Sequence, residues 1–455
     1  MQFENTNFAL RRISTDTRKL QPGEVFWALR GERHDGHRFV PQAAEIGALF
    51  CVVDEDADLA TTGPCVVVNN TQRALWDFAR WYRQQREAMV IGVTGSVGKT
   101  TTREMIHAVL SAEHQGTRSH GNFNNEIGLP LSLLDIDGHH DFAVVEMGAR
   151  RVGEIAALAE IAAPEVGVIT KIGPSHLETF GSLEKITEAK GELFEALPCP
   201  GFAVLPGDDP LTRSLAMRAA CPVILVGTGS ENHLRATAVE ANASGLTFIV
   251  DGWRYETPLI GRHSLTAALC AVAIGREIGM HPAAIAHGLK HFESPPGRCR
   301  LERCGEWTVI DDTYNANPSS MQAACHLLED WRGANKKLLI AGDMLELGDH
   351  AVACHRELGA QAARAKVDRL LAFGPHAEHV IAGALEAGFD SHFLAECPSL
   401  EALLAVLDCW LGPGDVVLVK GSRGMQMERV VDWLHHRAER EHEGDDARLL
   451  RRACA

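Results

Sequence analysis

The stretch Val-Ile-Gly-Val-Thr-Gly-Ser-Val-Gly-Lys-Thr-Thr-Thr occupies residues 90–102, and the rest of the chain is organised around it. Its first four residues form a short apolar run with β-branched side chains, which favours a buried strand. Two glycines interrupt that run within residues 94–98. Residues 99–110 then place Met105, Ile106 and Val109 on one helical face. The sequence therefore predicts a strand, a glycine turn and a helix in succession.

A glycine turn at the start of a helix can bind anions. Its backbone N–H groups converge, the helix dipole favours negative charge, and glycines let the backbone approach a phosphate closely. Lys99 adds a cation for phosphate oxygens, and the Thr100 hydroxyl can bind Mg²⁺. Val93 stands where the usual pattern has its first glycine, so one glycine is shifted. Gly-Lys-Thr at the predicted helix start nevertheless favours a nucleoside triphosphate loop over an ordinary turn.

Composition limits the classes of partner. The chain has 455 residues, enough for roughly three domains, and a formal net charge of −16. That charge argues against nucleic acid or an anionic membrane surface as the main partner. No apolar run predicts a membrane span. Residues 1–10 lack a signal-peptide core, and the 12 cysteines form no Cys-x-x-Cys pair, so we expect a cytoplasmic location, reduced thiols and no zinc site. Packing is a sufficient explanation for Cys299 and Cys304.

Apolar runs alternate with helical segments along most of the chain, which predicts an α/β protein. In residues 87–300 the runs at 142–146 and 166–170 predict further strands of a parallel sheet. Ser-Pro-Pro-Gly-Arg at 294–298 is a plausible boundary, and four runs beyond it predict a second doubly wound domain ending in a charged helical tail at 435–455. Residues 1–86 predict a small α/β domain. Its polar loops at 14–18 and 30–37 could hold a sugar nucleotide, but on spacing alone solvated turns are favoured.

Ligands of parallel sheets bind at the carboxyl ends of the strands. Glu146 ends one predicted strand and His176 follows the next, so both should face the crevice that Thr100 faces. A carboxylate, a hydroxyl and an imidazole there can hold Mg²⁺ against phosphate oxygens. Each of these residues alone is explained by a salt bridge or a surface position, and only their joint placement favours a metal site. Lys190 on a predicted helix is, on spacing alone, an ordinary solvated lysine.

Several motifs together resemble the Mur ligases, the ATP-dependent amide-forming enzymes of peptidoglycan precursor synthesis. The resemblance covers about residues 16–430. Its most specific pieces, besides the loop, are Gly-Asn-Phe-Asn-Asn-Glu-Ile-Gly at 121–128, Asp-Thr-Tyr-Asn-Ala-Asn-Pro at 312–318, Gly-Asp-Met-Leu-Glu-Leu-Gly at 342–348 and Lys-Gly-Ser-Arg at 420–423. Within the family the chain is similar to the branch that adds D-alanyl-D-alanine. It lacks the Asp-Asn-Pro-Arg-like segment of the members that add diaminopimelate or lysine.

The resemblance implies three domains. Residues 1–86 would bind the UDP precursor, residues 87–300 would bind ATP, and residues 301–455 would form a Rossmann-like domain that binds the incoming dipeptide. The implied substrates are UDP-N-acetylmuramoyl-tripeptide and D-alanyl-D-alanine, with ATP and Mg²⁺ as cofactors and a monomer as the working form. ATP would phosphorylate the terminal carboxylate of the tripeptide, and the dipeptide amine would then displace phosphate.

The resemblance also implies roles for individual residues. The expected catalytic residues are Lys99, Glu146, His176 and Lys190, and the expected Mg²⁺ ligands are Thr100, Glu146, His176 and Lys190 as a carbamate. Contacts to ATP are expected from Thr94, Gly95, Ser96, Val97, Gly98, Lys99, Thr100, His263, Arg298 and Asp312. Contacts to the other substrates are expected from Asp16, Thr17, Arg18, Gly31, Asp35, His37, Asn125, Asn315, Asn317, Lys420, Ser422 and Arg423. The chain departs from the family where an asparagine amide contacts adenine, since Ser264 and Thr266 carry hydroxyls instead.

Two alternatives remain open at this point. One is another amino-acid ligase of the same superfamily, of the diaminopimelate-adding or folylpolyglutamate type. The N-terminal domain argues against the folylpolyglutamate type, and Asn-Ala-Asn-Pro with Lys-Gly-Ser-Arg argues against the diaminopimelate-adding type. The other alternative is a P-loop kinase or nucleotide-binding protein without a ligation step, which would leave the third domain and Lys190 unexplained.

Overall fold

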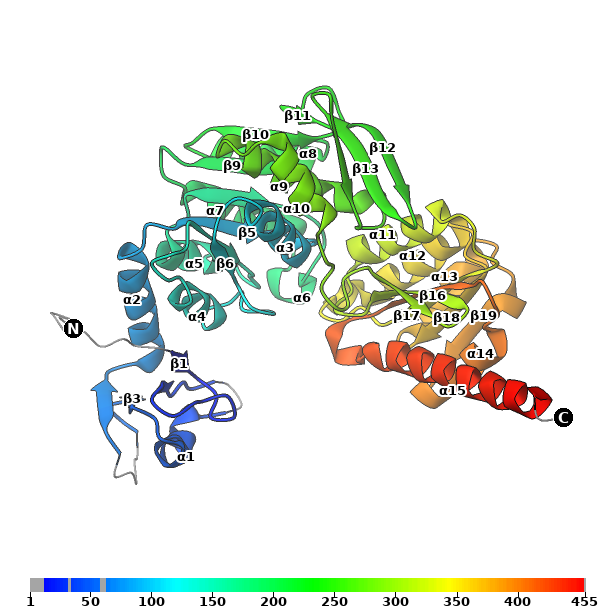
Figure 1. Cartoon of the computed structure of the whole chain (residues 1–455), viewed down its shortest axis with the longest axis horizontal. Coiled ribbons are helices and arrows are strands. Elements are labelled where there is room, and N and C mark those ends of the chain that lie inside the picture. The colour runs from blue at the N-terminus through cyan, green and yellow to red at the C-terminus, as the bar shows by residue number, and fades with distance from the viewer. Residues whose placement is uncertain (1–11, 32–33, 58–62, 454–455) are drawn as a thin grey trace.

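The computed structural model describes residues 12–31, 34–57 and 63–453, with side chains as far as residue 440. Its elements form an arch, with the N-terminal sheet at one end, the largest sheet in the middle and the C-terminal sheet at the other end (Figure 1). Among the described helices, none is both long enough and apolar enough to cross a bilayer.

The N-terminal sheet is parallel, with strand order β1-β2-β3-β4. Its strands are Ile13–Ser14, Val25–Trp27, Phe50–Asp54 and Cys65–Val68. Helix α1 (Val40–Ile46) packs on one face, and α2 (Thr71–Gln84) leads into the middle of the molecule (Figure 1). The α2 residues Leu75 and Phe78 pack against Val25, Trp27 and Val52 of the sheet.

The central sheet has seven parallel strands in the order β11-β10-β9-β8-β5-β7-β6. The strands in chain order are Met89–Thr94, Gly116–Arg118, Phe142–Glu146, Val166–Ile169, Phe202–Pro206, Val223–Gly227 and Leu234–Arg235, numbered β5 to β11. Strand β5 lies between β8 and β7, and it is buried because helices cover both faces of the sheet. The predicted strand at 142–146 and the predicted helix at 99–110 match β7 and α3 (Lys99–Leu110).

The two faces of the central sheet have different helices. Helices α3, α9 (Leu265–Glu277) and α10 (Pro282–Lys290) share one apolar cluster, which contains Ile106, Leu269 and Leu289. Helices α4 (Gly128–Leu134), α5 (Glu154–Ala162) and α7 (Leu183–Glu195) share the other. A short helix, α6 (Leu177–Phe180), precedes α7, while α8 (Pro210–Ser214) follows β9. After β11 the chain forms an antiparallel sheet of β12 (Thr237–Asn242), β13 (Gly245–Val250) and β14 (Trp253–Thr257).

The C-terminal sheet has the order β15-β16-β20-β17-β18-β19, and only its edge strand β15 (Arg300–Cys304) runs antiparallel to its neighbour. The other strands are β16 (Trp307–Asp312), β17 (Lys337–Gly342), β18 (Arg369–Phe373), β19 (Leu394–Cys397) and β20 (Val416–Lys420). Helices α11 (Pro318–Asp330), α12 (Ala351–Arg364), α13 (Ala377–Glu386) and α14 (Leu400–Trp410) cover it.

The last helix, α15 (Glu428–Ala453), starts earlier than the predicted tail at 435–455. Its first turns carry Val430, Val431 and Leu434, which join the apolar cluster under the C-terminal sheet. Burial of these side chains explains why the helix begins at Glu428 rather than in the charged segment that follows. Residues 454 and 455 lie outside the described residues.

Candidate active site

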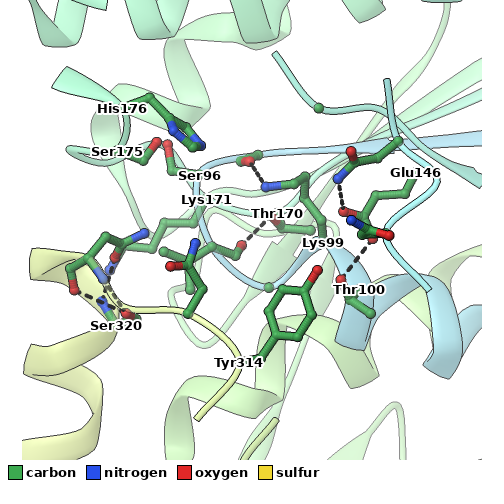
Figure 2. Close-up of a pocket in the computed structure, with 18 of the residues that line it drawn as sticks. Ser96, Lys99, Thr100, Glu146, Thr170, Lys171, Ser175, His176, Tyr314 and Ser320 are labelled. Carbon is green, nitrogen blue, oxygen red and sulfur yellow. Dashed lines mark hydrogen bonds between the residues drawn. The ribbon is translucent and has the colours of Figure 1, made fainter. Parts of the chain in front are cut away.

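A crevice of about 1000 Å³ lies between the central sheet and the C-terminal sheet. The loop after β5, the ends of β7 and β8, and the loop after β16 all line it. Figure 2 shows Lys99, Thr100 and Glu146 grouped on one side, with Ser175 and His176 further along and Tyr314 approaching from the C-terminal part. The carboxyl ends of the central parallel strands therefore meet at one site, as the sequence predicts.

The phosphate loop is fixed by its neighbours. Gly95 has a φ of +144°, and a Cβ at this position would lie 2.1 Å from the Thr170 hydroxyl oxygen, so only glycine fits. The Thr170 hydroxyl donates a hydrogen bond to the Val97 carbonyl at 2.6 Å. The Ser96 hydroxyl donates to the Gly173 carbonyl at 2.7 Å. The loop is therefore held by the segment that follows β8, which the sequence did not predict to have this function.

Lys99 turns back over the loop that precedes it. Its ammonium donates a hydrogen bond to the Gly95 carbonyl at 2.8 Å. Burial lowers the pKa of Lys99 and the neighbouring Arg298 lowers it further, while Glu146 acts in the opposite direction. The side chain thus holds its nitrogen directly against the turn that is built to accept phosphate.

Thr100 and Glu146 form the centre of the predicted metal site. The Thr100 hydroxyl donates to Glu146 Oε2 at 2.8 Å, and Asn124 Nδ2 donates to the other carboxylate oxygen at 2.8 Å. Arg103 Nη1 lies 3.3 Å from Glu146 Oε2. Burial acts to raise the pKa of Glu146, but the charges of Lys99 and Arg103 outweigh it and hold this pKa below its usual value. The buried carboxylate is therefore ionised, which a metal ligand requires.

Lys190 is buried in the same crevice, with a relative exposure of 2%. It lies on α7, and its ammonium faces the ring of Phe180 at 5.8 Å. Burial, reinforced by the charge of Lys99, lowers the pKa of Lys190 to about 7. A substantial fraction of this amine is therefore neutral near pH 7, and a neutral amine is the form that can react with carbon dioxide to give a carbamate.

His176 meets the C-terminal part of the molecule. Its Nδ1 contacts the carboxylate of Glu346, which also receives a hydrogen bond from Arg150 Nη2 at 3.0 Å. The backbone N–H of Glu178 donates to the Glu346 carbonyl at 3.2 Å. Glu346 belongs to one of the family motifs, but the sequence predicts no role for it, because the residues that it contacts are distant in the chain.

Arg298, Tyr314 and Asp312 complete the crevice from the C-terminal side. The Arg298 guanidinium stacks 3.7 Å above the Tyr314 ring, and its Nη2 donates to the Thr100 hydroxyl oxygen at 3.1 Å. Arg298 Nε is buried and has no hydrogen-bond partner in the part of the chain that the structure describes. A buried donor left over at the phosphate loop fits a site that is completed by an anion.

Ser264 and Thr266, the two hydroxyl residues in the region expected to hold adenine, differ in their hydrogen bonds. The Ser264 hydroxyl donates to the Ile260 carbonyl at 2.9 Å, and this side chain is buried. Its proton is therefore used at the start of α9, and the residue also lines the crevice. Thr266 and His263 line the crevice, with His263 Nε2 lying 3.7 Å from the Cys299 sulfur. Thr266 is the hydroxyl that remains available to a base.

Residues expected to bind the dipeptide also line the crevice, but several have internal partners. The Lys420 ammonium contacts Asp312 Oδ2 at 2.7 Å and the Asn315 carbonyl at 2.9 Å. The Ser422 hydroxyl accepts a hydrogen bond from the Leu345 N–H at 2.9 Å. Both residues therefore fix the loops around the site. By contrast, the Arg423 side chain is 65% exposed and pairs only with Glu428, at 3.1 Å, among the contacts described.

The three expected asparagines act on the local backbone as well. Asn317 caps α11 by accepting from the Ser320 N–H at 2.9 Å, and Asn125 accepts from the Gly128 N–H at 2.9 Å at the start of α4. The Asn315 side chain accepts from the Ala316 N–H at 2.9 Å. Each lines the crevice. Their positions therefore depend on helix ends and turns rather than on flexible loops.

The N-terminal candidate residues lie outside this crevice. Asp16 pairs with Arg18 at 2.7 Å, which lowers the pKa of Asp16 to about 2, and the Thr17 hydroxyl donates to Gln42 at 2.9 Å. His37 uses both ring nitrogens, with Nδ1 2.7 Å from Asp35 Oδ1 and Nε2 accepting from the Asp54 N–H at 3.0 Å. Gly31 is exposed, and Glu32 and Arg33 of the same loop lie outside the described residues. The contact between His37 and Asp35 therefore stabilises the conformation of this loop.

Comparison with known proteins gives a consistent result. Three family models match the chain: the Mur ligase family catalytic domain at residues 10–81, the Mur ligase middle domain at 93–275 and the Mur ligase glutamate ligase domain at 297–423. A UDP-N-acetylmuramoyl-tripeptide–D-alanyl-D-alanine ligase from Bacillus subtilis is 38% identical, with 94% of each chain covered.

Two solved structures are also similar over nearly the whole chain. A MurF from Acinetobacter baumannii superposes with a TM-score of 0.86, 31% identity and 94% of each chain covered. A MurF ligase from Thermotoga maritima in complex with ADP has a TM-score of 0.84 and 28% identity, covering 96% of this chain and all (100%) of that one.

Proposed function

The chain belongs to the Mur ligase family, and we propose that it joins D-alanyl-D-alanine to UDP-N-acetylmuramoyl-tripeptide in peptidoglycan precursor synthesis. It is an ATP-dependent, ADP-forming ligase. The names of its relatives support this function over the diaminopimelate-adding and folylpolyglutamate alternatives, and over a kinase without a ligation step.

One observation carries the assignment of the site. The Thr100 hydroxyl accepts from Arg298 at 3.1 Å and donates to Glu146 at 2.8 Å, so two parts of the chain meet at the first turn of the phosphate-loop helix. A nucleotide bound there would contact both parts at once. The buried, unpartnered Arg298 Nε supports an anion at this junction.

We assign the phosphate transfer to residues of the central part. The loop N–H groups and Lys99 bind the β- and γ-phosphates and stabilise the charge that develops as the terminal phosphoryl group moves to the tripeptide carboxylate. Thr100, Glu146 and carbamylated Lys190 would supply oxygen ligands, which fit Mg²⁺, and His176 would add a nitrogen ligand. When bound, Mg²⁺ neutralises negative charge on the phosphate oxygens. The carbamate would turn the Lys190 side chain from a cation into an anion, which suits this position.

The second step forms the amide bond. The free amine of D-alanyl-D-alanine attacks the acyl carbon of the acyl phosphate, the carbon–nitrogen bond forms, and the bond from the acyl carbon to the phosphate oxygen breaks. We assign Arg423, an exposed cation at the crevice, to the dipeptide carboxylate, while Lys420 and Ser422 hold the loops beside it. Exclusion of water at this stage favours the amine over hydrolysis.

The three domains divide the substrates between them. We propose domain limits of 1–86, 87–300 and 301–455, with the first domain binding the uridine nucleotide. Asp16, Thr17, Arg18, Gly31, Asp35 and His37 would shape or line that site. The N-terminal residues lie outside the crevice. The precursor must therefore extend from the uridine-nucleotide site of the first domain into the crevice. A monomeric cytoplasmic enzyme is consistent with a reaction between small molecules.

Phosphate release from ATP tests the proposal. We expect release to need both UDP-N-acetylmuramoyl-tripeptide and D-alanyl-D-alanine, with a pentapeptide product detected by mass. Release that needs neither substrate would keep the nucleotide site and discard the ligase function. Release that needs a different amino-acid acceptor would move the chain to another branch of the family.

A further inference from the structure

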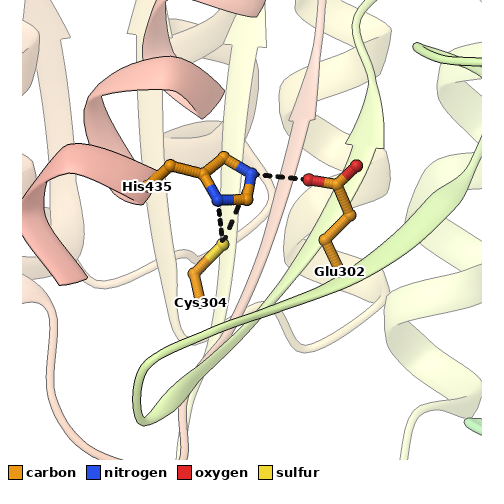
Figure 3. A group of neighbouring side chains, drawn as sticks. All are labelled: Glu302, Cys304 and His435. Carbon is orange, nitrogen blue, oxygen red and sulfur yellow. Dashed lines mark hydrogen bonds and ion pairs between the residues drawn. The ribbon is translucent and has the colours of Figure 1, made fainter. Parts of the chain in front are cut away.

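Three side chains with metal-binding atoms meet at the edge strand β15 of the C-terminal sheet, outside the crevice. Glu302 and Cys304 lie two residues apart on the edge strand β15, so their side chains share one face. His435 comes from α15, which packs against that strand. Figure 3 shows the imidazole between the carboxylate and the thiol.

The sulfur–nitrogen separations match those of ligands around one metal ion, while the nitrogen–oxygen separation is that of a hydrogen bond. The Cys304 sulfur lies 3.3 Å from His435 Nδ1 and 3.6 Å from Nε2, and Nε2 lies 2.6 Å from Glu302 Oε2. One ligand atom from each residue lies within 4.8 Å of the others. Ligands bonded to a tetrahedral Zn²⁺ at roughly 2.0–2.3 Å are about 3.2–3.7 Å apart. A rotation of the imidazole and a small outward shift of the carboxylate would therefore bring the three atoms around one ion.

The surroundings leave room for a fourth ligand. Cys304 is buried, whereas the His435 side chain is 43% exposed and the Glu302 side chain 18% exposed. Arg300 Nε lies 3.1 Å from Glu302 Oε1, and Oε2 is the oxygen that faces His435. The arginine thus orients the carboxylate through one oxygen and leaves the other for the cluster. Water can complete a tetrahedral site from the exposed side.

We propose that Glu302, Cys304 and His435 bind one borderline-soft divalent cation, Zn²⁺ above all, and that this ion joins α15 to the edge strand β15. A thiolate with an imidazole selects such ions over Mg²⁺ and Ca²⁺, which prefer oxygen ligands. The site is separate from the reaction crevice, since none of its three residues lines the crevice. It therefore does not depend on the proposed ligase function.

Local spacing in the sequence could not show this cluster. Cys304 and His435 are 131 residues apart, and no Cys-x-x-Cys or similar pair marks either of them. The ligands come together only because α15 packs on the C-terminal sheet through Val430, Val431 and Leu434.

Cobalt titration of the full-length protein, freed of metal with a chelator, tests the proposal. We expect one equivalent of Co²⁺ to produce a near-ultraviolet thiolate-to-cobalt charge-transfer band, which Zn²⁺ then removes by displacing Co²⁺. Cys304→Ser should abolish the band. His435→Ala and Glu302→Gln should weaken binding at least tenfold. Zn²⁺ should raise the midpoint of thermal unfolding in the unmodified protein but not in Cys304→Ser.

His436→Ala is the matched control, because His436 is the next residue on α15, its side chain is 76% exposed, and it pairs with Glu439. This variant should bind Co²⁺ like the unmodified protein. Cobalt bound by the expected Mg²⁺ ligands would give no thiolate band, because none of them is a cysteine, and Cys299→Ser, which removes the cysteine that lines the crevice, should keep the band. Absence of the band in the unmodified protein, or its persistence in Cys304→Ser, would overturn the proposal.

Discussion

The His176 imidazole contacts the Glu346 carboxylate directly, although 170 residues separate them in the chain. Both residues have positive φ values, 51° and 61°, which non-glycine residues rarely adopt. Arg150 adds a second contact to the same carboxylate at 3.0 Å. Glu346 therefore joins the C-terminal part to an expected metal ligand, and it stands in the position of the carboxylates that orient metal-binding histidines.

Glu346→Gln should weaken this contact between the two parts. The carboxylate is partly exposed, and the pKa of Glu346 is lowered first by its hydrogen bond to His176. An ion pair in that setting contributes about 1 kcal/mol, so we expect kcat/KM for D-alanyl-D-alanine to fall about fivefold. Asp349→Asn, an exposed change in the same loop, should have no effect. Unchanged kinetics in Glu346→Gln would show that the contact between His176 and Glu346 does not contribute to the reaction.

Lys99→Ala should abolish ligation without unfolding the protein. The side chain contacts only the Gly95 carbonyl among its described hydrogen bonds, so its removal leaves the loop supported by Ser96 and Thr170. Loss of a cation at the developing charge should cost at least about a thousandfold in kcat. Phosphate release with all substrates present measures the effect, and circular dichroism checks the fold. Substrate-dependent phosphate release at the original rate would remove Lys99 from the reaction.

Lys190→Ala should lose activity and recover part of it when a small carboxylate such as formate is supplied. A carboxylate that diffuses into the emptied position can replace the carbamate oxygens as ligands. The pKa of about 7 predicts that carbamylation, which uses the neutral amine, increases as pH rises through this value. Lys185→Ala, an exposed change on the same helix, should neither lose activity nor respond to formate. A fully active Lys190→Ala would contradict a role in the site.

The C-terminal part should lose stability in mild acid because of His355. This side chain is fully buried, its Nδ1 donates to the Ala351 carbonyl at 2.7 Å, and its Nε2 accepts from the Met344 N–H at 3.0 Å. Burial lowers the pKa of His355 from 6.5 to about 4, and His376 stacks on it at 4.6 Å. A neutral histidine is required at both hydrogen bonds.

The direction of the pH dependence of stability follows from the pKa values of His355 in the unfolded and folded chain. The unfolded chain takes up a proton near pH 6.5 and the folded chain only near 4, so the stabilisation is complete above 6.5 and is lost as the pH falls between these values. The loss reaches about 3 kcal/mol. Urea unfolding between about pH 7 and about pH 5 should therefore show a steeper decline in the unmodified protein than in His355→Gln. Equal slopes would assign the decline to other groups, and the exposed His350→Gln serves as control.

Much of the fold could be predicted from sequence because it depends on local patterns. The phosphate loop is contiguous, and its strand, turn and helix each follow from neighbouring residues, so α3 was predicted with its observed limits. The short edge strands were harder. Strands β1 and β11 have two residues each, too few for an apolar period to be visible.

Residue types at the site were also predictable, but their partners were not. The motifs indicated four candidate Mg²⁺ ligands, which all line one crevice in the structure: Thr100, Glu146, His176 and Lys190. The contacts of Asn124 and Arg103 with Glu146 were not predicted. They form only when the segment at 121–128 folds back over α3. Lys420 lines the crevice, and its ion pair with Asp312, which the sequence did not predict, follows from the parallel pairing of β20 with β16.

The sequence by itself determined the chemistry: an anion-binding loop, a lysine and hydroxyl at its end, and carboxylates at strand ends. These features depend on residues within a few positions of each other, where backbone geometry alone fixes the distances. The tertiary structure decided which distant groups form ion pairs and hydrogen bonds with each other, such as His176 with Glu346 and Cys304 with His435. Hydrogen bonds and ion pairs act over a few ångströms, so residues far apart in the chain can form them only after the sheets and helices have packed.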